Sequence, residues 1–128
     1  MATEGVRLRE GGNLVAGADL SAKQYYAVKL SATARQVVLV AASTDTVLGV
    51  LENKPTSGQA ADINFLGFGK ASAGAAISAG AAVMANSSGQ MIPWVSGSGN
   101  CIAGYAVEAA AGANVIFLME VKPAPVIT

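Results

Sequence analysis

The chain repeats one short pattern, first as GVLENKPTSGQAADINFLG (49–67) and again as GYAVEAAAGANVIFLM (104–119). Each copy has an apolar run, a glycine-bearing link and a second apolar run. The first link places Pro55 and Gly58 where a turn needs a preset φ and a left-handed residue, and the second keeps Gly112 but has no proline. Both copies therefore predict a β-hairpin.

Two hairpins of similar length predict an antiparallel sheet or barrel in which each hairpin covers the apolar face of the other. Apolar alternation over 25–30 and the run at 36–41 predict two further strands, and residues 90–95 predict a short strand. Pro93 places that strand at a sheet edge, because proline lacks the N–H that a central strand uses. The expected fold class is all-β, with at most one short helix: a small β-barrel or sandwich of antiparallel hairpins.

The expected organisation is a flexible N-terminal arm over 1–12, a single β-rich domain over 13–122 and a C-terminal tail over 123–128. The arm is polar, shows neither the helical nor the strand period, and ends in Gly11-Gly12. In the last strand, 114–122, both alternating sets of side chains are apolar, so both of its faces are expected to be covered, with another subunit as a candidate cover for one of them.

Residues 71–85 are the ambiguous segment. Their alanine content favours a helix, but two glycines and two serines interrupt it, and the large residues do not follow a helical stripe. We favour extended pieces around 75–77 and 82–85 joined by a turn at 78–80, with a helix as the alternative.

Composition restricts the function. The 128 residues contain eight basic and eight acidic side chains, no histidine and one cysteine. Cys/His zinc sites and histidine-dependent bases are thereby excluded. No basic cluster suggests nucleic acid as a partner, and neither a secretory signal nor a membrane-spanning run is evident. Charged residues make up 12% of the chain, about half of the usual fraction. Burial against other subunits or a partner explains so uncharged a surface, and a neutral surface rich in small residues is the alternative.

Few residues suggest chemistry. Glu52 and Glu108 hold equivalent places in the repeat, and a carboxylate pair suits glycosidic chemistry, but solvated charges at strand ends are the better interpretation. No catalytic, cofactor-binding or metal-binding residue is predicted, and no cofactor. Trp94 beside Pro93 is a candidate interface anchor, with a tryptophan at the edge of the core as an equal alternative. The alternative to an interface protein is a carbohydrate- or ligand-binding β-module, such as a head-fibre or adhesion domain, using Trp94, Tyr25, Tyr26 and Tyr105.

Several stretches between Gly17 and Val121 resemble the capsid decoration (cement) proteins of tailed bacteriophages: QYYAVKL (24–30), VLGVLENKP (47–55), Gly58, AISAG (76–80), GQ (89–90) and GYAVE (104–108). The resemblance implies a β-rich virion protein, made in the bacterial host cytoplasm. It would bind the major capsid protein on the outer capsid surface as a homo-oligomer, with a trimer expected, and stabilise the shell. Arg7, Arg9 and Trp94 are the predicted capsid or intersubunit contacts.

Overall fold

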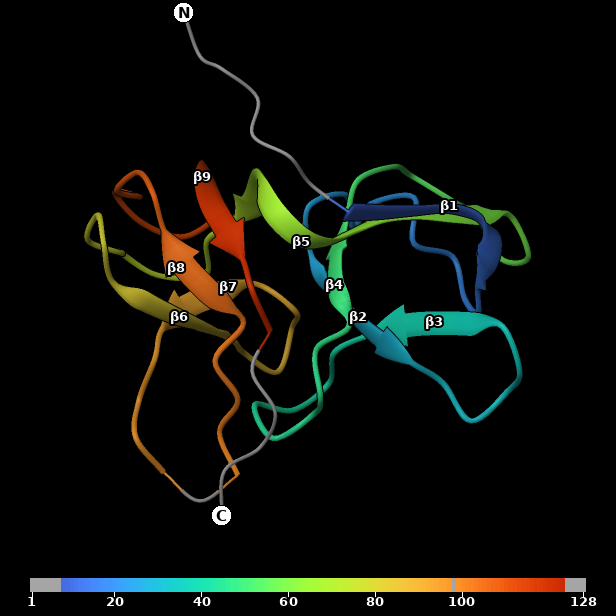
Figure 1. Cartoon of the computed structure of the whole chain (residues 1–128), viewed down its shortest axis with the longest axis horizontal. Coiled ribbons are helices and arrows are strands. Elements are labelled where there is room, and N and C mark those ends of the chain that lie inside the picture. The colour runs from blue at the N-terminus through green and yellow to red at the C-terminus, as the bar shows by residue number, and fades with distance from the viewer. Residues whose placement is uncertain (1–7, 98, 124–128) are drawn as a thin grey trace, which may run out of the picture.

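The computed structural model describes residues 8–97 and 99–123, and side chains from Leu14 onward. The described residues contain no helix and form nine strands (Figure 1): β1 Leu8–Ala16, β2 Ala27–Leu30, β3 Gln36–Leu39, β4 Gly49–Leu51, β5 Ala60–Ser72, β6 Ala82–Ala85, β7 Met91–Pro93, β8 Gly104–Ala106 and β9 Ile116–Val121.

The first five strands close into a barrel. Their order is β1-β3-β2-β4-β5, and β1 pairs antiparallel with β5 to complete the circle. Closure leaves no free strand edge in this part of the molecule. The barrel interior holds one apolar cluster, made of Ala16, Leu20, Val28, Val37, Leu51, Ala61 and Ile63.

Strand β5 is long enough to belong to two sheets. Beyond the barrel it reaches Gly67, whose φ of 113° is open to glycine and strained for other residues, and it then pairs with β9 from Gly67 to Ser72. The second sheet follows in the order β5-β9-β8-β6-β7. Figure 1 shows this sheet beside the barrel, with β5 passing from one to the other.

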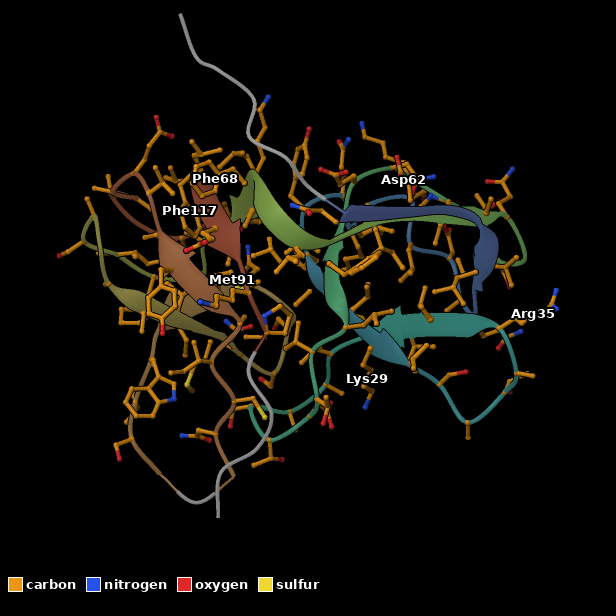
Figure 2. The ribbon with its side chains drawn as sticks, in the orientation of Figure 1. Lys29, Arg35, Asp62, Phe68, Met91 and Phe117 are labelled. Carbon is orange, nitrogen blue, oxygen red and sulfur yellow. The ribbon has the colours of Figure 1, made fainter. Side chains whose placement is uncertain are left out.

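A second apolar cluster lies between the two sheets. In β4, Leu51 points into the barrel while its neighbour Val50 joins the second cluster, as strand alternation requires. Val50 there packs with the inner face of the second sheet, which includes Met91 and Phe117. Figure 2 labels these two side chains on the second sheet.

Both predicted hairpins are present. Val50 pairs with Asn64 in the first, and Tyr105 pairs with Glu120 in the second. Gly58 takes the expected left-handed conformation, with a φ of 82°. In the second link the left-handed residue is Asn114, with a φ of 66°, and not Gly112. Asparagine tolerates this region better than most residues, so the second turn forms without a glycine there.

The opening glycines of the two copies have the same structural role. A Cβ on Gly49 would overlap the carbonyl oxygen of Asn64, and one on Gly104 would overlap the carbonyl oxygen of Glu120. In each hairpin the returning strand passes too close for any side chain. The glycine that opens each copy is therefore explained by the close approach of the two strands in each hairpin.

Other segments also follow the expectations. Residues 71–85 are extended, not helical: Ile77 forms an isolated bridge with Ala110, Gly80 turns the chain with a φ of 83°, and β6 follows. Strand β7, which carries Pro93, stands at the end of the strand order.

Three details differ from the sequence interpretation. Residues 8–12, expected in the N-terminal arm, belong to β1 and pair with β5, so the boundary expected after residue 12 falls inside a strand. The backbone ladder holds them there, although their side chains show no period. In β2, Ala27 and Val28 are both buried and Leu30 is exposed, so this strand lacks the single buried face that alternation suggested.

The third difference concerns β9. Phe117, Met119 and Val121 are buried, whereas Ile116 is exposed and Leu118 is half-buried. The expected cover over the second face of this strand is absent from the part of the chain that the structure describes.

Candidate interaction surfaces

The register of the second sheet aligns side chains in rows across its outer face. One row runs from Phe68 on β5 to Glu120 on β9, Tyr105 on β8 and Ala82 on β6. Their neighbours in sequence, such as Gly69 and Met119, belong to the inner, buried face. Because the strands lie ~4.8 Å apart, the rings of Phe68 and Tyr105 start roughly 10 Å from each other.

A second row lies beside the first. Lys70 on β5 is opposite Leu118 on β9, and the backbone N–H of Val107 donates to the Leu118 carbonyl at 2.9 Å. Ile116 follows further along β9. We call Phe68, Tyr105, Val107, Ile116 and Leu118 the outer apolar face.

The outer apolar face is unusually exposed for its chemistry. Four of its members, Phe68, Tyr105, Val107 and Ile116, expose 40–46% of their surface. Scattered exposed apolar residues are ordinary, but a contiguous set is typical of an interaction site. Lys70 and Glu120 stand among these residues, so the face includes side chains of both charge signs.

A second exposed feature follows β7. The backbone N–H of Trp94 donates to the Ala82 carbonyl at 2.9 Å, and Asn100 Nδ2 donates to the Val95 carbonyl at 2.9 Å. Their side chains remain open, with Trp94 38% and Val95 58% exposed. These bonds hold the backbone in place while the apolar side chains project. We call Trp94 and Val95 the 94–95 corner.

A pocket of about 250 Å³ opens beside β2, lined by Lys29, Leu30, Thr46, Val47 and Leu48. Val47 is buried, whereas Leu30, at 59%, is the most exposed large apolar side chain of the described residues. We call this the Leu30 pocket. Figure 2 shows the Lys29 side chain projecting from β2 at this place.

Asp45 fixes the rim of the Leu30 pocket. Its Oδ2 lies 2.8 Å from Lys29 Nζ and accepts hydrogen bonds from the backbone N–H groups of Ala41 at 2.9 Å and Ala42 at 3.0 Å. The bond from Lys29, followed by the bond from Ala41, lowers the pKa of the Asp45 carboxyl below its ordinary value. The ammonium at the rim is thus already neutralised within the chain.

The structure separates the predicted contact residues. Arg7 lies outside the described residues. Arg9 is in β1, where its backbone is opposite Asn64, but its side chain is not among those described. Trp94 is exposed in the corner.

The other aromatic candidates are divided between two environments. Tyr25 packs against the larger core cluster, and Tyr26 is half-buried with the Lys23 ammonium 5.0 Å from its ring centre. Tyr105 alone of the three tyrosines is exposed.

The carboxylates have separate surroundings. Glu108 Oε1 accepts a hydrogen bond from the Leu118 backbone N–H at 3.1 Å, which places it beside β9. Glu52 lies instead near Gly69 on β5. Of the described residues, no group of three His, Cys, Asp or Glu side chains is placed to hold a metal ion.

Two buried polar groups lie outside these surfaces. Cys101 is buried, and that burial, followed by the charge of Asp45, raises the pKa of its thiol. Asn64 is also buried, and its side-chain amide has no hydrogen-bond partner within the described residues.

No described segment is a helix long and apolar enough to cross a membrane.

The outer apolar face has a sequence signal that is clear only in retrospect. The apolar even-numbered residues of 114–122 suggested a covered face, and the structure shows that this face is open. Phe68 and Tyr105 could not be joined to it from sequence, because their alignment depends on the pairing of β5 and β8 with β9.

Comparison with known proteins finds a similar fold and a matching family. A search of curated proteins found no match. Among solved structures, the head fibre gp8.5 N base of bacteriophage phi29 has a similar fold, with a TM-score of 0.69 and 18% sequence identity, over 94% of this chain and 100% of that one.

The family comparison extends to most of the sequence. The model of the phage cement proteins matches residues 22–122 of the 128, a range that contains both hairpins, the outer apolar face, the 94–95 corner and the Leu30 pocket. The chain therefore belongs to the phage cement protein family and is a structural protein of a phage virion.

Proposed function

We propose that this protein binds the outer surface of a phage capsid as a homo-oligomer, with a trimer as the expected form, and stabilises the shell. The major capsid protein is the proposed partner. The observation that carries the proposal is the outer apolar face, which exposes aromatic and aliphatic side chains on a rigid, paired sheet. The family and the head fibre fold support the same role.

The size of this face indicates how binding works. Fully burying a large apolar side chain contributes about 1.5–3 kcal/mol, so covering the exposed ~40% of the four most open side chains of this face contributes roughly 2–5 kcal/mol. Association itself costs about 4–15 kcal/mol. A single copy held by this face alone would therefore bind weakly. Copies linked in an oligomer bind a repeating lattice more tightly, because each additional contact forms at high effective concentration.

The test uses capsids of the parent phage assembled without this protein. Phe68→Ser combined with Tyr105→Ser removes both rings of the face, and cosedimentation with capsids should show at least a tenfold weaker association. Tyr26→Ser is the matched control, since Tyr26 is half-buried away from the outer apolar face. Equal binding by the double variant and the control would refute the role of this face. Absence of wild-type binding to any mature capsid would refute the function itself.

A carbohydrate-binding module is the second candidate. One observation favours it: Tyr105 on β8 and Trp94, directly after β7, are both exposed, and β8 and β7 belong to the same sheet. Quenching of Trp94 fluorescence by glycans, abolished in Trp94→Ser, would support this activity. A glycan array without a signal would leave capsid binding as the remaining candidate.

A further inference from the structure

We infer that the 94–95 corner of one copy inserts into the Leu30 pocket of a second copy. This contact names the self-association surface of the proposed function, and it rests on that function insofar as it requires a homo-oligomer. The corner adjoins the outer apolar face, because Ala82 lies between Tyr105 and Trp94, but its residues are not among those assigned to the capsid.

Exposure is unevenly distributed among the large apolar side chains. Leu30 and Val95, at 59% and 58%, stand above all other large apolar side chains of the described residues, whose exposure ends at 46%. One belongs to a pocket and the other to a projection. These two exposed apolar features cover each other if copies meet in this way.

The pocket has the size and chemistry for a single aromatic side chain. Its volume of about 250 Å³ falls below the range of roughly 300–1,000 Å³ that is typical of small-molecule sites. Leu30, Val47 and Leu48 give it apolar walls. The Lys29 ammonium at the rim can face an indole ring, a contact that contributes about 0.5–1 kcal/mol at an exposed site.

Charge also favours an aromatic occupant over an acidic one. Lys29 is already paired with Asp45 at 2.8 Å, and both side chains are more than two-thirds buried. An incoming carboxylate would have to compete with that pair. An indole needs no charge partner and leaves the ion pair intact.

The corner is prepared for insertion. The backbone of Trp94 is bonded to Ala82, and that of Val95 is held by Asn100, which in turn accepts a hydrogen bond from Ser43 Oγ at 3.0 Å. Pro93 immediately before it further limits the backbone. A projection that is already ordered loses little conformational entropy on binding. The exposure of both side chains shows that they do not fill the pocket of their own chain.

The geometry of this contact determines the type of assembly. Corner and pocket are different patches, so the contact is head-to-tail and not a two-fold interface. Such contacts close into a ring when the rotation per subunit permits. A ring of three is the form proposed above. The net charge of zero means that the copies do not repel each other as they approach.

A head-to-tail contact can be tested by complementation. The corner variant is Trp94→Ser with Val95→Ser, and the pocket variant is Leu30→Glu. Each variant alone lacks either the corner or the pocket, and every contact needs both. Sedimentation velocity should therefore show monomers where the wild type forms oligomers. Mixed at equal concentration, the two variants retain one intact corner and one intact pocket, so they should form a dimer and nothing larger.

The changed side chains are exposed, so each variant should still unfold cooperatively, with a melting temperature lower only by what lost self-association removes, and a dimer in the mixture would itself prove that both are folded. Tyr105→Ser is the control and should assemble as the wild type does. Wild-type assembly by either variant, or a mixture that stays monomeric while the wild type assembles, overturns the inference but leaves capsid binding standing. A wild type that is monomeric both in solution and on capsids overturns the inference together with the homo-oligomer of the proposed function.

Discussion

Replacement of Gly104 by alanine should be among the most damaging single changes in this protein. Gly104 begins β8 and is opposite Val121 of β9. A Cβ there would overlap the Glu120 carbonyl oxygen and stand 2.8 Å from Met119 Cε. The methionine can turn aside, but the carbonyl is backbone and belongs to the ladder that joins β8 to β9.

The expected loss follows from these two contacts. Overpacking a tight site costs about 1–3 kcal/mol. Relief requires β8 to move away from β9, and the loss of two ladder hydrogen bonds adds roughly 1–3 kcal/mol. The sum, about 2–6 kcal/mol, is a large part of the 5–15 kcal/mol that typically stabilises a domain. For a chain of this length, the melting temperature should fall by about 10–20 °C.

Thermal unfolding followed by circular dichroism measures this loss at one fixed protein concentration, since self-association would raise the melting temperature. Gly112→Ala is the matched control: its Cβ would meet nothing within 4 Å, so its melting temperature should stay equal or rise slightly. If Gly104→Ala melts within about 2 °C of the wild type, the close approach of β8 and β9 is not as described here.

Three further changes test other parts of the structure. Gly49→Ala should lower the melting temperature as Gly104→Ala does, because its Cβ would overlap the Asn64 carbonyl oxygen and stand 2.9 Å from Ile63 Cγ2; an unchanged temperature would show that the two hairpins are not equivalent. Asn64→Leu should raise the free energy of unfolding in urea by about 1 kcal/mol, since a buried amide without a partner is replaced by an apolar side chain, and a fall would contradict this. The pKa of Asp45 is lowered in the folded state, so its bonds stabilise the fold above its ordinary pKa of 3.8 and cease to do so as the pH falls through the lower, folded value. Asp45→Asn should therefore be less stable than the wild type at pH 7, and the difference should shrink in acid; a constant difference would refute this.

Local signals in the sequence were sufficient for the hairpins. Proline and glycine at 55 and 58 specify one turn, and the apolar runs on either side have no alternative to pairing. The helix alternative over 71–85 fails because packing against the rest of the molecule outweighs the local preference. Its small residues pack into the core cluster as extended chain, where Ala71, Ala73 and Ala85 are buried, so tertiary packing overrides alanine's helical preference.

Long-range arrangement was less accessible. Nothing in residues 8–12 shows that they pair with β5, because a ladder of backbone hydrogen bonds needs no particular side chains. The positive φ at Gly67 could not be predicted either, since glycine is common in this chain and only the structure shows which one carries a φ of 113°. These two features decide that the chain forms a closed barrel joined to a second sheet, and not two stacked sheets.

The structure shows where the uncharged, apolar parts of the surface lie. A chain with 12% charged residues could have spread small, neutral side chains over its whole surface. Instead, most of the exposed large apolar residues lie at two places: the outer apolar face with the adjoining 94–95 corner, and the Leu30 pocket beside β2. A protein that met only one kind of partner would need one such place. Two of them fit a protein with two kinds of neighbour: a shell beneath it, and copies of itself on either side, one receiving its corner and the other filling its pocket.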